Sequence, residues 1–205
     1  MDLQCLSGTI TRATLVGLAL CGCAPSATLP VGESQWPQIA PQWEAYDGSG
    51  DGQVGQKVDA FLFPDQTGAL VDFRQFLGFV TVLDLGATWC GPCQTAAAES
   101  QELQDTLQAE GPVWLMHVLL QDVTSGPPDS ADASEWAALF GLQFPVLADE
   151  FQTLESSWSV FTWPTVLVVA PDGTIVERFD GPVPAQDVTE AVLLTLETYA
   201  EDLRE

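Results

Sequence analysis

Basic side chains are scarce in this chain of 205 residues. Five Lys and Arg stand against 29 Asp and Glu, which gives a formal net charge of −24. A surface with so few cations is poorly suited to bind phosphate, so the composition argues against nucleic acid as a partner. The acidity is typical of adaptation to solubility, to salt or to a cell-surface setting, and by itself it identifies no partner.

The apolar run near the N-terminus, Ala13–Cys23, is too short to span a bilayer but has the length found in secretion signals. Its last four residues, Leu20–Cys23, resemble a bacterial lipoprotein signal, with Cys23 as the cysteine that would be lipidated after cleavage. Because Asp2 and a single basic residue, Arg12, make a weak start, an uncleaved anchor and a plain signal peptide stay open. All three versions predict export, and the lipoprotein signal also predicts a lipid anchor on the periplasmic side of a bacterial membrane.

Cysteines are few: the chain has five, at positions 5, 21, 23, 90 and 93. Cleavage before Cys23 leaves no cysteine for a structural bridge beyond the close pair Cys90 and Cys93. This pair follows the apolar, β-branched run Val80–Leu85, which predicts a strand-to-helix junction. A helix N-terminus favours a thiolate, and a two-residue spacer lets one sulfur reach the other. The spacing therefore favours a thiol–disulfide redox site.

The residues after the signal segment (1–23) divide into a tether and a domain. Residues 24–55 are rich in Pro, Gly, Ser and Gln and predict a flexible tether whose end could pack on the domain. Within it, Asp47–Val54 imitates the start of a calcium-binding EF-hand loop. The twelfth position, however, is Val58 rather than Glu, which favours a solvated turn over a calcium site.

Residues 56–205 alternate short apolar runs with helical patterns, as in an α/β sheet covered by helices. Asp132 and Glu135 resemble a helix-start capping pair, and residues 171–173 have the composition of a hairpin turn. The expected strands span residues 59–63, 79–85, 113–120, 165–170 and 174–179, and the expected helices follow Cys93 up to residue 110 and span 132–140, 149–157 and 188–199.

Three segments together resemble a thioredoxin-fold protein: Val82–Cys93, Phe144–Leu147 and Trp163–Gly181. The likeness is to the exported, membrane-tethered TlpA/ResA-like thiol–disulfide oxidoreductases, including redoxin domain lipoproteins, and it covers residues 55 to 204. It implies a thioredoxin-like α/β fold with a central mixed β-sheet flanked by helices. It also implies client proteins as partners, an unidentified membrane electron donor, no cofactor, and a reductive role.

The resemblance assigns roles to the residues of the pair. Cys90, expected to be the more exposed, would attack a client disulfide, and Cys93 would resolve the mixed disulfide. Trp89 would shield the site and shape the docking surface, although plain packing is the alternative. Gly91 and Pro92 would set the local backbone.

Two further positions come from the same resemblance. Asp84, six residues before Cys90, would be a buried carboxyl with a raised pKa that carries the proton of Cys93. The alternative is a strand-end Asp that finds water or a backbone donor. Trp163 and Pro164 would form a cis peptide across from the cysteines, where the client main chain could pair; a trans Pro at an edge strand is the alternative.

Other functions fit the sequence less well. His117, the only histidine, lies in a predicted core strand, and one His with two Cys does not complete a zinc site. A copper-binding metallochaperone without redox turnover is the remaining alternative, although such proteins typically use a longer cysteine spacing. A peroxidase is disfavoured because Ala87 stands where relatives of that kind carry Thr. Gln94 departs from tethered relatives, which often have a basic residue there, and the thiolate of Cys90 should be less favoured as a result.

Overall fold

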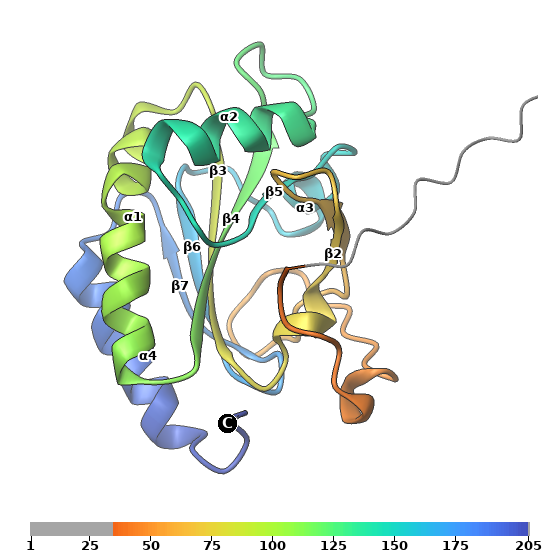
Figure 1. The fold of residues 1–205 in the computed structure, drawn as a ribbon, viewed down its shortest axis with the longest axis vertical. Coiled ribbons are helices and arrows are strands. Elements are labelled where there is room, and N and C mark those ends of the chain that lie inside the picture. Colours follow the sequence, from red (N-terminus) through yellow and green to blue (C-terminus); the bar gives the residue numbers. More distant parts are fainter. Residues whose placement is uncertain (1–34, 205) are drawn as a thin grey trace, which may run out of the picture. The chain divides into compact units, whose positions relative to one another are not determined.

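The computed structural model describes residues 35–204, so the predicted signal segment and Cys23 lie outside the described residues. Its main sheet has the strand order β5-β4-β3-β6-β7 (Figure 1). The pairs β3–β4 and β4–β5 are parallel, and β3–β6 and β6–β7 are antiparallel, which confirms the expected mixed sheet. The strands are β3 (Val80–Ala87), β4 (Val113–Gln121), β5 (Val146–Ala148), β6 (Thr165–Val169) and β7 (Ile175–Asp180).

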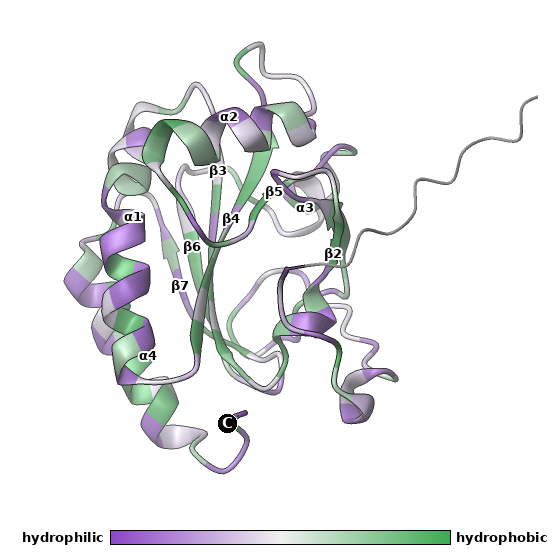
Figure 2. Cartoon of the chain, viewed as in Figure 1, coloured by the Kyte–Doolittle hydropathy of each residue, from purple (hydrophilic) through white to green (hydrophobic). Residues whose placement is uncertain are grey.

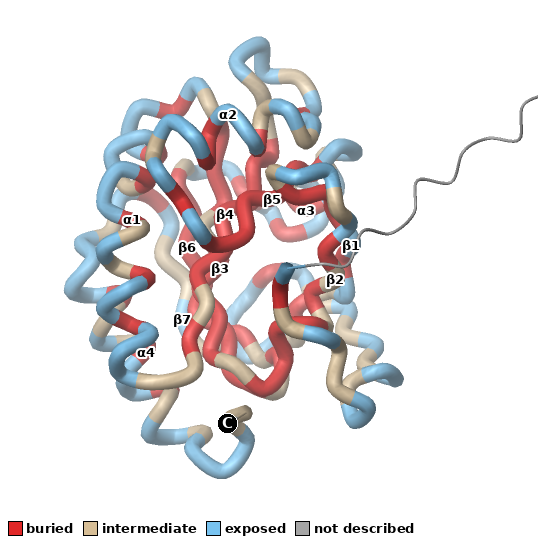
Figure 3. The backbone as a smooth tube through the Cα atoms, in the orientation of Figure 1, coloured by how far each residue is buried: buried red, intermediate tan, exposed pale blue. Residues whose placement is uncertain are grey.

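Two layers cover the sheet, and the alternation along β3 decides which side chains meet each layer. Val80 and Val82 pack against three helices, whereas Leu83 and Leu85 pack against the aromatic N-terminal part of the domain. The strands β3, β4, β5 and β6 are almost wholly buried, whereas the edge strand β7 carries polar residues and is mostly half-buried or exposed. The outer faces of the helices are polar and exposed (Figures 2 and 3). The first layer consists of α1 (Gly91–Glu110), α2 (Ser130–Phe140) and α4 (Ala185–Thr198), and the second of η1 (Pro41–Trp43), β1 (Leu62–Pro64), β2 (Leu70–Asp72), η2 (Phe73–Phe76) and α3 (Thr153–Ser157).

Local hydrogen bonds explain where the predicted boundaries were wrong. The first strand is Leu62–Pro64 rather than 59–63, and it pairs with β2 in a separate two-stranded sheet. The helix expected to start at Asp132 is capped by Asp129, whose carboxylate accepts the backbone N–H groups of Ala131 and Asp132. Asp132 is the third residue of that helix and bonds back to the N–H of Asp129, so Glu135 takes no part in the capping box.

A similar displacement affects the next helix, α3. We expected it from residue 149, but it begins at Thr153. The buried Asp149 carboxylate instead accepts the N–H groups of Thr153 and Leu154, at 3.0 and 2.8 Å. Asp149 thus stabilises the first turn of a helix to which it does not belong. The hairpin between β6 and β7 forms as expected, with Gly173 at positive φ.

The described part of the predicted tether contacts the domain. Trp36 is 6% exposed, and its indole N–H donates to the Asp65 carboxylate at 2.8 Å. Its ring also meets that of Trp114 edge-on, with the ring centres 6.0 Å apart. Near the other end, the N–H of Gly55 donates to the carbonyl of Ile175. Among the described residues, no helix combines the length and the apolar character needed to cross a membrane.

Candidate functional site

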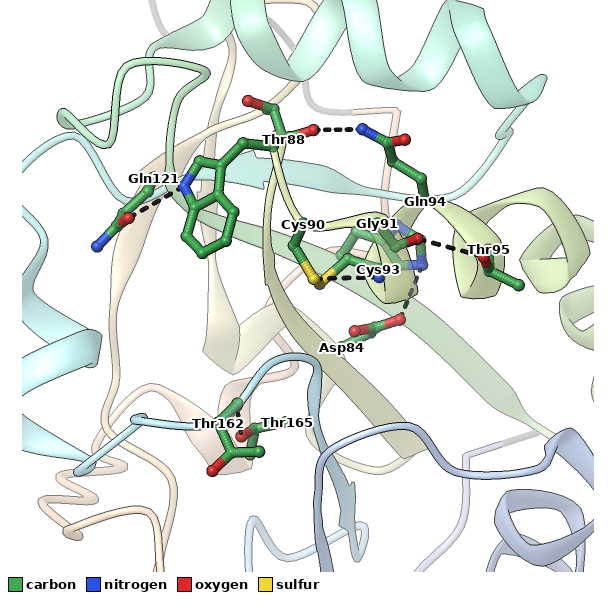
Figure 4. The surroundings of a disulfide bond; sticks show 12 residues. Asp84, Thr88, Cys90, Gly91, Cys93, Gln94, Thr95, Gln121, Thr162 and Thr165 are labelled. Carbon is green, nitrogen blue, oxygen red and sulfur yellow. Dashed lines mark hydrogen bonds and ion pairs between the residues drawn. A yellow bond between two sulfur atoms is a disulfide. The ribbon is translucent and has the colours of Figure 1, made fainter.

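The cysteine pair stands where β3 passes into α1. Cys90 is the N-cap of α1, and its sulfur accepts the backbone N–H of Cys93 at 3.1 Å. Pro92 lies in the first turn of the helix, where its missing N–H costs nothing. Cys90 and Cys93 form a disulfide with their Cα atoms 5.2 Å apart, so the structure presents the oxidised state (Figure 4). The predicted strand-to-helix junction is therefore confirmed.

The expectation that Cys90 is the more exposed cysteine was wrong for this state, because both residues are 3% exposed. The bond to Cys93 and the hydrogen bond from its N–H hold the Cys90 sulfur against the helix terminus. Next to the pair, Trp89 is 47% exposed and stacks on Trp163, with ring centres 5.4 Å apart. The Trp89 indole N–H donates to the side chain of Gln121, which fixes the ring at the surface.

Gly86, a residue that sequence reasoning missed, lets Cys93 pack directly on β3. A Cβ atom on Gly86 would lie 3.2 Å from the sulfur of Cys93 and 3.3 Å from its Cβ, which is tighter than normal packing. A glycine in the interior of a strand often marks such a close approach. That signal was present in the sequence, two residues after Asp84.

Asp84 and His117 face each other from neighbouring strands. They are register partners in the parallel β3–β4 pair, and His117 Nε2 lies 3.5 Å from Asp84 Oδ2. Burial raises the pKa of Asp84 to about 7 and lowers the pKa of His117 to about 3. Asp84 lies within β3 and its side chain is 13% exposed, so it is not a strand-end carboxylate. Figure 4 draws its carboxyl below the cysteine pair.

A cavity of about 60 Å³ borders Asp84, which is large enough to admit water. Glu99 and Ser100, both on α1, supply its other polar groups. Glu99 also lines a larger groove of about 350 Å³ that runs between the start of α1 and the loop before β6. The cavity and the groove share Ala96, Glu99, Val166 and Val183 in their linings, so Glu99 is the polar residue common to both. The residues that line the groove are Pro92, Thr95, Ala96, Glu99, Pro164, Val166, Pro182 and Val183.

The groove brings Pro92 and Pro164 together, as expected for the two sides of one site. The peptide bond between Trp163 and Pro164 is cis, which confirms that part of the prediction. Gly91 is exposed and a Cβ there would meet nothing within 4 Å, so space does not require glycine at this position.

No cation of the described residues is engaged with the cysteine pair. Lys57, Arg74 and Arg178 pair with Asp172, Asp72 and Asp180, and Arg204 donates to the carbonyl of Gln38. The residue after Cys93 is Gln94, whose amide donates to the carbonyl of Thr88 at 2.8 Å. Within the described range 35–204, no cluster of three or more His, Cys, Asp or Glu could hold a metal ion.

Comparisons with known proteins agree with this geometry. The family model described as AhpC/TSA family matches residues 54–178. The chain is 25% identical over 131 residues to thiol-disulfide oxidoreductase ResA of Bacillus thuringiensis, covering 63% of this chain and 70% of that protein. It is 24% identical over 137 residues to ResA of Geobacillus thermodenitrificans, covering 67% and 75%.

Solved structures extend the likeness to the fold. A Chlorobium tepidum protein, provisionally assigned as thiol:disulfide interchange protein DsbE, superposes with a TM-score of 0.61 at 23% identity. The superposition covers 70% of this chain and 98% of that protein. The expected thioredoxin-like fold is therefore confirmed.

Proposed function

We propose that this chain, which belongs to the AhpC/TSA family and is similar to thiol–disulfide oxidoreductases, is exported and reduces disulfides of client proteins outside the cytoplasm. The observation that carries this proposal is the Cys90–Cys93 disulfide at the N-terminus of α1, beside a groove. A helix N-terminus stabilises a thiolate once the bond is reduced. A nearby groove gives an extended client segment a place to lie.

The reaction begins with the reduced pair. The thiolate of Cys90 attacks a client disulfide, one client sulfur leaves as a thiolate, and a mixed disulfide forms. Cys93 then loses its proton and attacks the Cys90 sulfur, which releases the second client thiolate. The client thiolates take up protons, so two electrons pass to the client and the pair ends as the disulfide described here.

Asp84 is the proposed acceptor of the proton from Cys93. A carboxyl group with a pKa of about 7 exists in both protonation states at neutral pH, so it can take a proton and return it. The adjoining cavity, with Glu99 and Ser100, supplies the polar route by which that proton reaches solvent. Water in the cavity could complete this route, since the space is large enough for it.

Client binding is assigned to the surface around the disulfide. Trp89 and Trp163 offer a stacked aromatic platform, and Pro92 and Pro164 line the neighbouring groove. Aromatic rings that are partly exposed provide contact area at low entropic cost. Gly91, also exposed, leaves the approach to the sulfur atoms open.

Export and anchoring belong to the same proposal and rest on the N-terminal sequence. A lipid on Cys23 would hold the domain at the periplasmic side of a bacterial membrane, and a membrane protein would return electrons to the pair. Radiolabelled palmitate should enter the wild-type chain expressed in a bacterium and should not enter Cys23→Ser. Equal labelling of both chains would refute the anchor at this residue.

Insulin reduction driven by dithiothreitol tests the activity. Wild-type protein should accelerate precipitation of the insulin B chain, whereas Cys90→Ser should not. The reduction potential of the pair tests the direction: a value near that of thioredoxin, about −270 mV, supports a reductant, and one near about −120 mV indicates an oxidant. Stoichiometric Cu(I) binding without disulfide turnover would favour the metallochaperone instead.

A further inference from the structure

A buried histidine that this reaction does not use lies against the proposed proton acceptor. His117, in the middle of β4, is 3% exposed and is the register partner of Asp84. Both side chains face the layer formed by α1, α2 and α4: Asp84 borders the cavity, and His117 contacts Ser100 and Trp136. A polar group buried this deeply is costly unless every hydrogen-bonding atom has a partner.

The partner on one side fixes the tautomer of the ring. The indole N–H of Trp136 lies 3.0 Å from His117 Nδ1. Because an indole nitrogen can only donate, Nδ1 must be the unprotonated nitrogen that accepts. The proton of the neutral ring is therefore on Nε2. Burial also lowers the pKa of His117 to about 3, so the ring stays neutral at physiological pH.

The fixed Nε2–H has two oxygen atoms within reach. Ser100 Oγ lies 3.0 Å away and Asp84 Oδ2 lies 3.5 Å away. The Ser100 hydroxyl donates its own proton to the carbonyl of Ala96 at 2.8 Å, so its oxygen is free to accept from His117. While Asp84 is protonated, the Nε2–H of His117 donates to Ser100 Oγ, the nearer of the two oxygen atoms. Once Asp84 is ionised, a charge-assisted bond to its carboxylate becomes the stronger of the two.

We propose that His117 is a positioning residue for Asp84: its Nε2–H, fixed by Trp136, moves from Ser100 to the Asp84 carboxylate each time Asp84 releases its proton. This rests on the proposed function, in which Asp84 accepts the proton of Cys93. The other titratable side chain at the cavity is Glu99 of α1, and the cysteine pair lies above Asp84 in Figure 4. Both β6 and α4 contribute only apolar side chains to the cavity.

The test is a titration of the Asp84 carboxyl by carbon NMR in the full-length oxidised protein, where Cys93 is in the disulfide and does not titrate. His117→Leu should raise the pKa of Asp84 by about one unit, a tenfold change in its ionisation constant, because the donor is gone. His117→Gln, whose amide N–H reaches the position of Nε2, should restore most of the shift. Ser100→Ala removes the competing acceptor and should lower the pKa of Asp84.

Opposite shifts of the Asp84 pKa in His117→Leu and Ser100→Ala support the proposal. If His117 had a purely structural role, the direction of the shift would not depend on whether the donor or the competing acceptor is removed. An unchanged pKa in both variants, or a rise in both, would overturn it. If His117→Leu does not fold, Ser100→Ala decides by itself, together with the nitrogen NMR spectrum of the wild-type ring. A proton found on Nδ1 of His117 in that spectrum would also overturn the proposal.

The two proposals fail separately. The carboxyl titration needs no turnover, so a protein inactive toward insulin could still give the opposite shifts. Conversely, an active protein with an unchanged Asp84 pKa in both variants would keep its function and lose the role of His117. In the reduced protein, His117→Leu should also move the pH profile for resolution of the mixed disulfide upward by the same shift, and His117→Gln should move it back.

Discussion

The substitution Asp84→Asn should make the protein more stable at pH 8 and less active at pH 7. Burial raises the pKa of Asp84 from its ordinary value of 3.8 to about 7. Between these values the unfolded chain gives up the proton while the folded chain holds it, so the free energy of unfolding falls as the pH rises. The cost to the folded state reaches about 4 kcal/mol at pH 8, and it vanishes below about pH 4. Asn mimics the protonated carboxyl and avoids that cost.

Urea unfolding of both oxidised proteins from pH 4 to pH 8 measures the effect. The variant should gain stability over the wild type progressively through this range, whereas the two should be alike at the acidic end. The matched control is Asp187→Asn, which removes an exposed carboxylate in the first turn of α4 and should not become more stable than the wild type at pH 8. A gap between Asp84→Asn and wild type that is constant with pH would refute the raised pKa. In stopped-flow experiments, resolution of the mixed disulfide at pH 7 should be slower by about 10²-fold, the lower range for loss of a general base.

Three other predictions follow from single contacts. Gly86→Ala should lower the stability of the oxidised protein by about 1–3 kcal/mol in urea, because the new methyl group crowds Cys93; equal stability of variant and wild type would show that Cys93 can move aside. In the reduced protein, Gln94→Lys should lower the pKa of the Cys90 thiol by up to about one unit, measured by thiolate absorbance. Gln94→Met is the uncharged control, and an equal shift in both variants would exclude a charge effect. Trp36→Phe should lower the free energy of unfolding by about 1–3 kcal/mol, because the buried Asp65 carboxylate loses a hydrogen-bond donor at 2.8 Å. A loss of the same size in a chain that already carries Asp65→Asn would contradict this cause.

Local sequence patterns predicted the parts of the fold that local chemistry decides. The β-branched run before Cys90, the Pro in the first helical turn and the hairpin with Gly173 all formed as expected. The capping residues did not, because the sequence offered several acidic side chains near each helix start. Asp129 accepts the free N–H groups two and three residues further along the chain, and Asp149 those four and five residues further along.

Single candidate residues of the site could be named from the sequence, but not the contacts that they make across neighbouring strands. The resemblance to thioredoxin-fold proteins implied both Asp84, six residues before Cys90, and Pro164, just before the hairpin. The meeting of Asp84 with His117 depends on the register of two strands separated by a whole helix, which periodicity does not give. Cys90 and Cys93 are equally buried in the disulfide-bonded state described here, and the sequence does not specify that redox state.

Trapping of a mixed disulfide tests the central claim most directly. In Cys93→Ser the resolving sulfur is gone, so reduced protein mixed with a disulfide-containing client should accumulate a covalent adduct. Mass spectrometry should place that adduct on Cys90, and dithiothreitol should release it. An adduct on Cys93 in Cys90→Ser that forms as fast as the one on Cys90, or no adduct in either variant, would contradict the assignment of Cys90 as the attacking thiol.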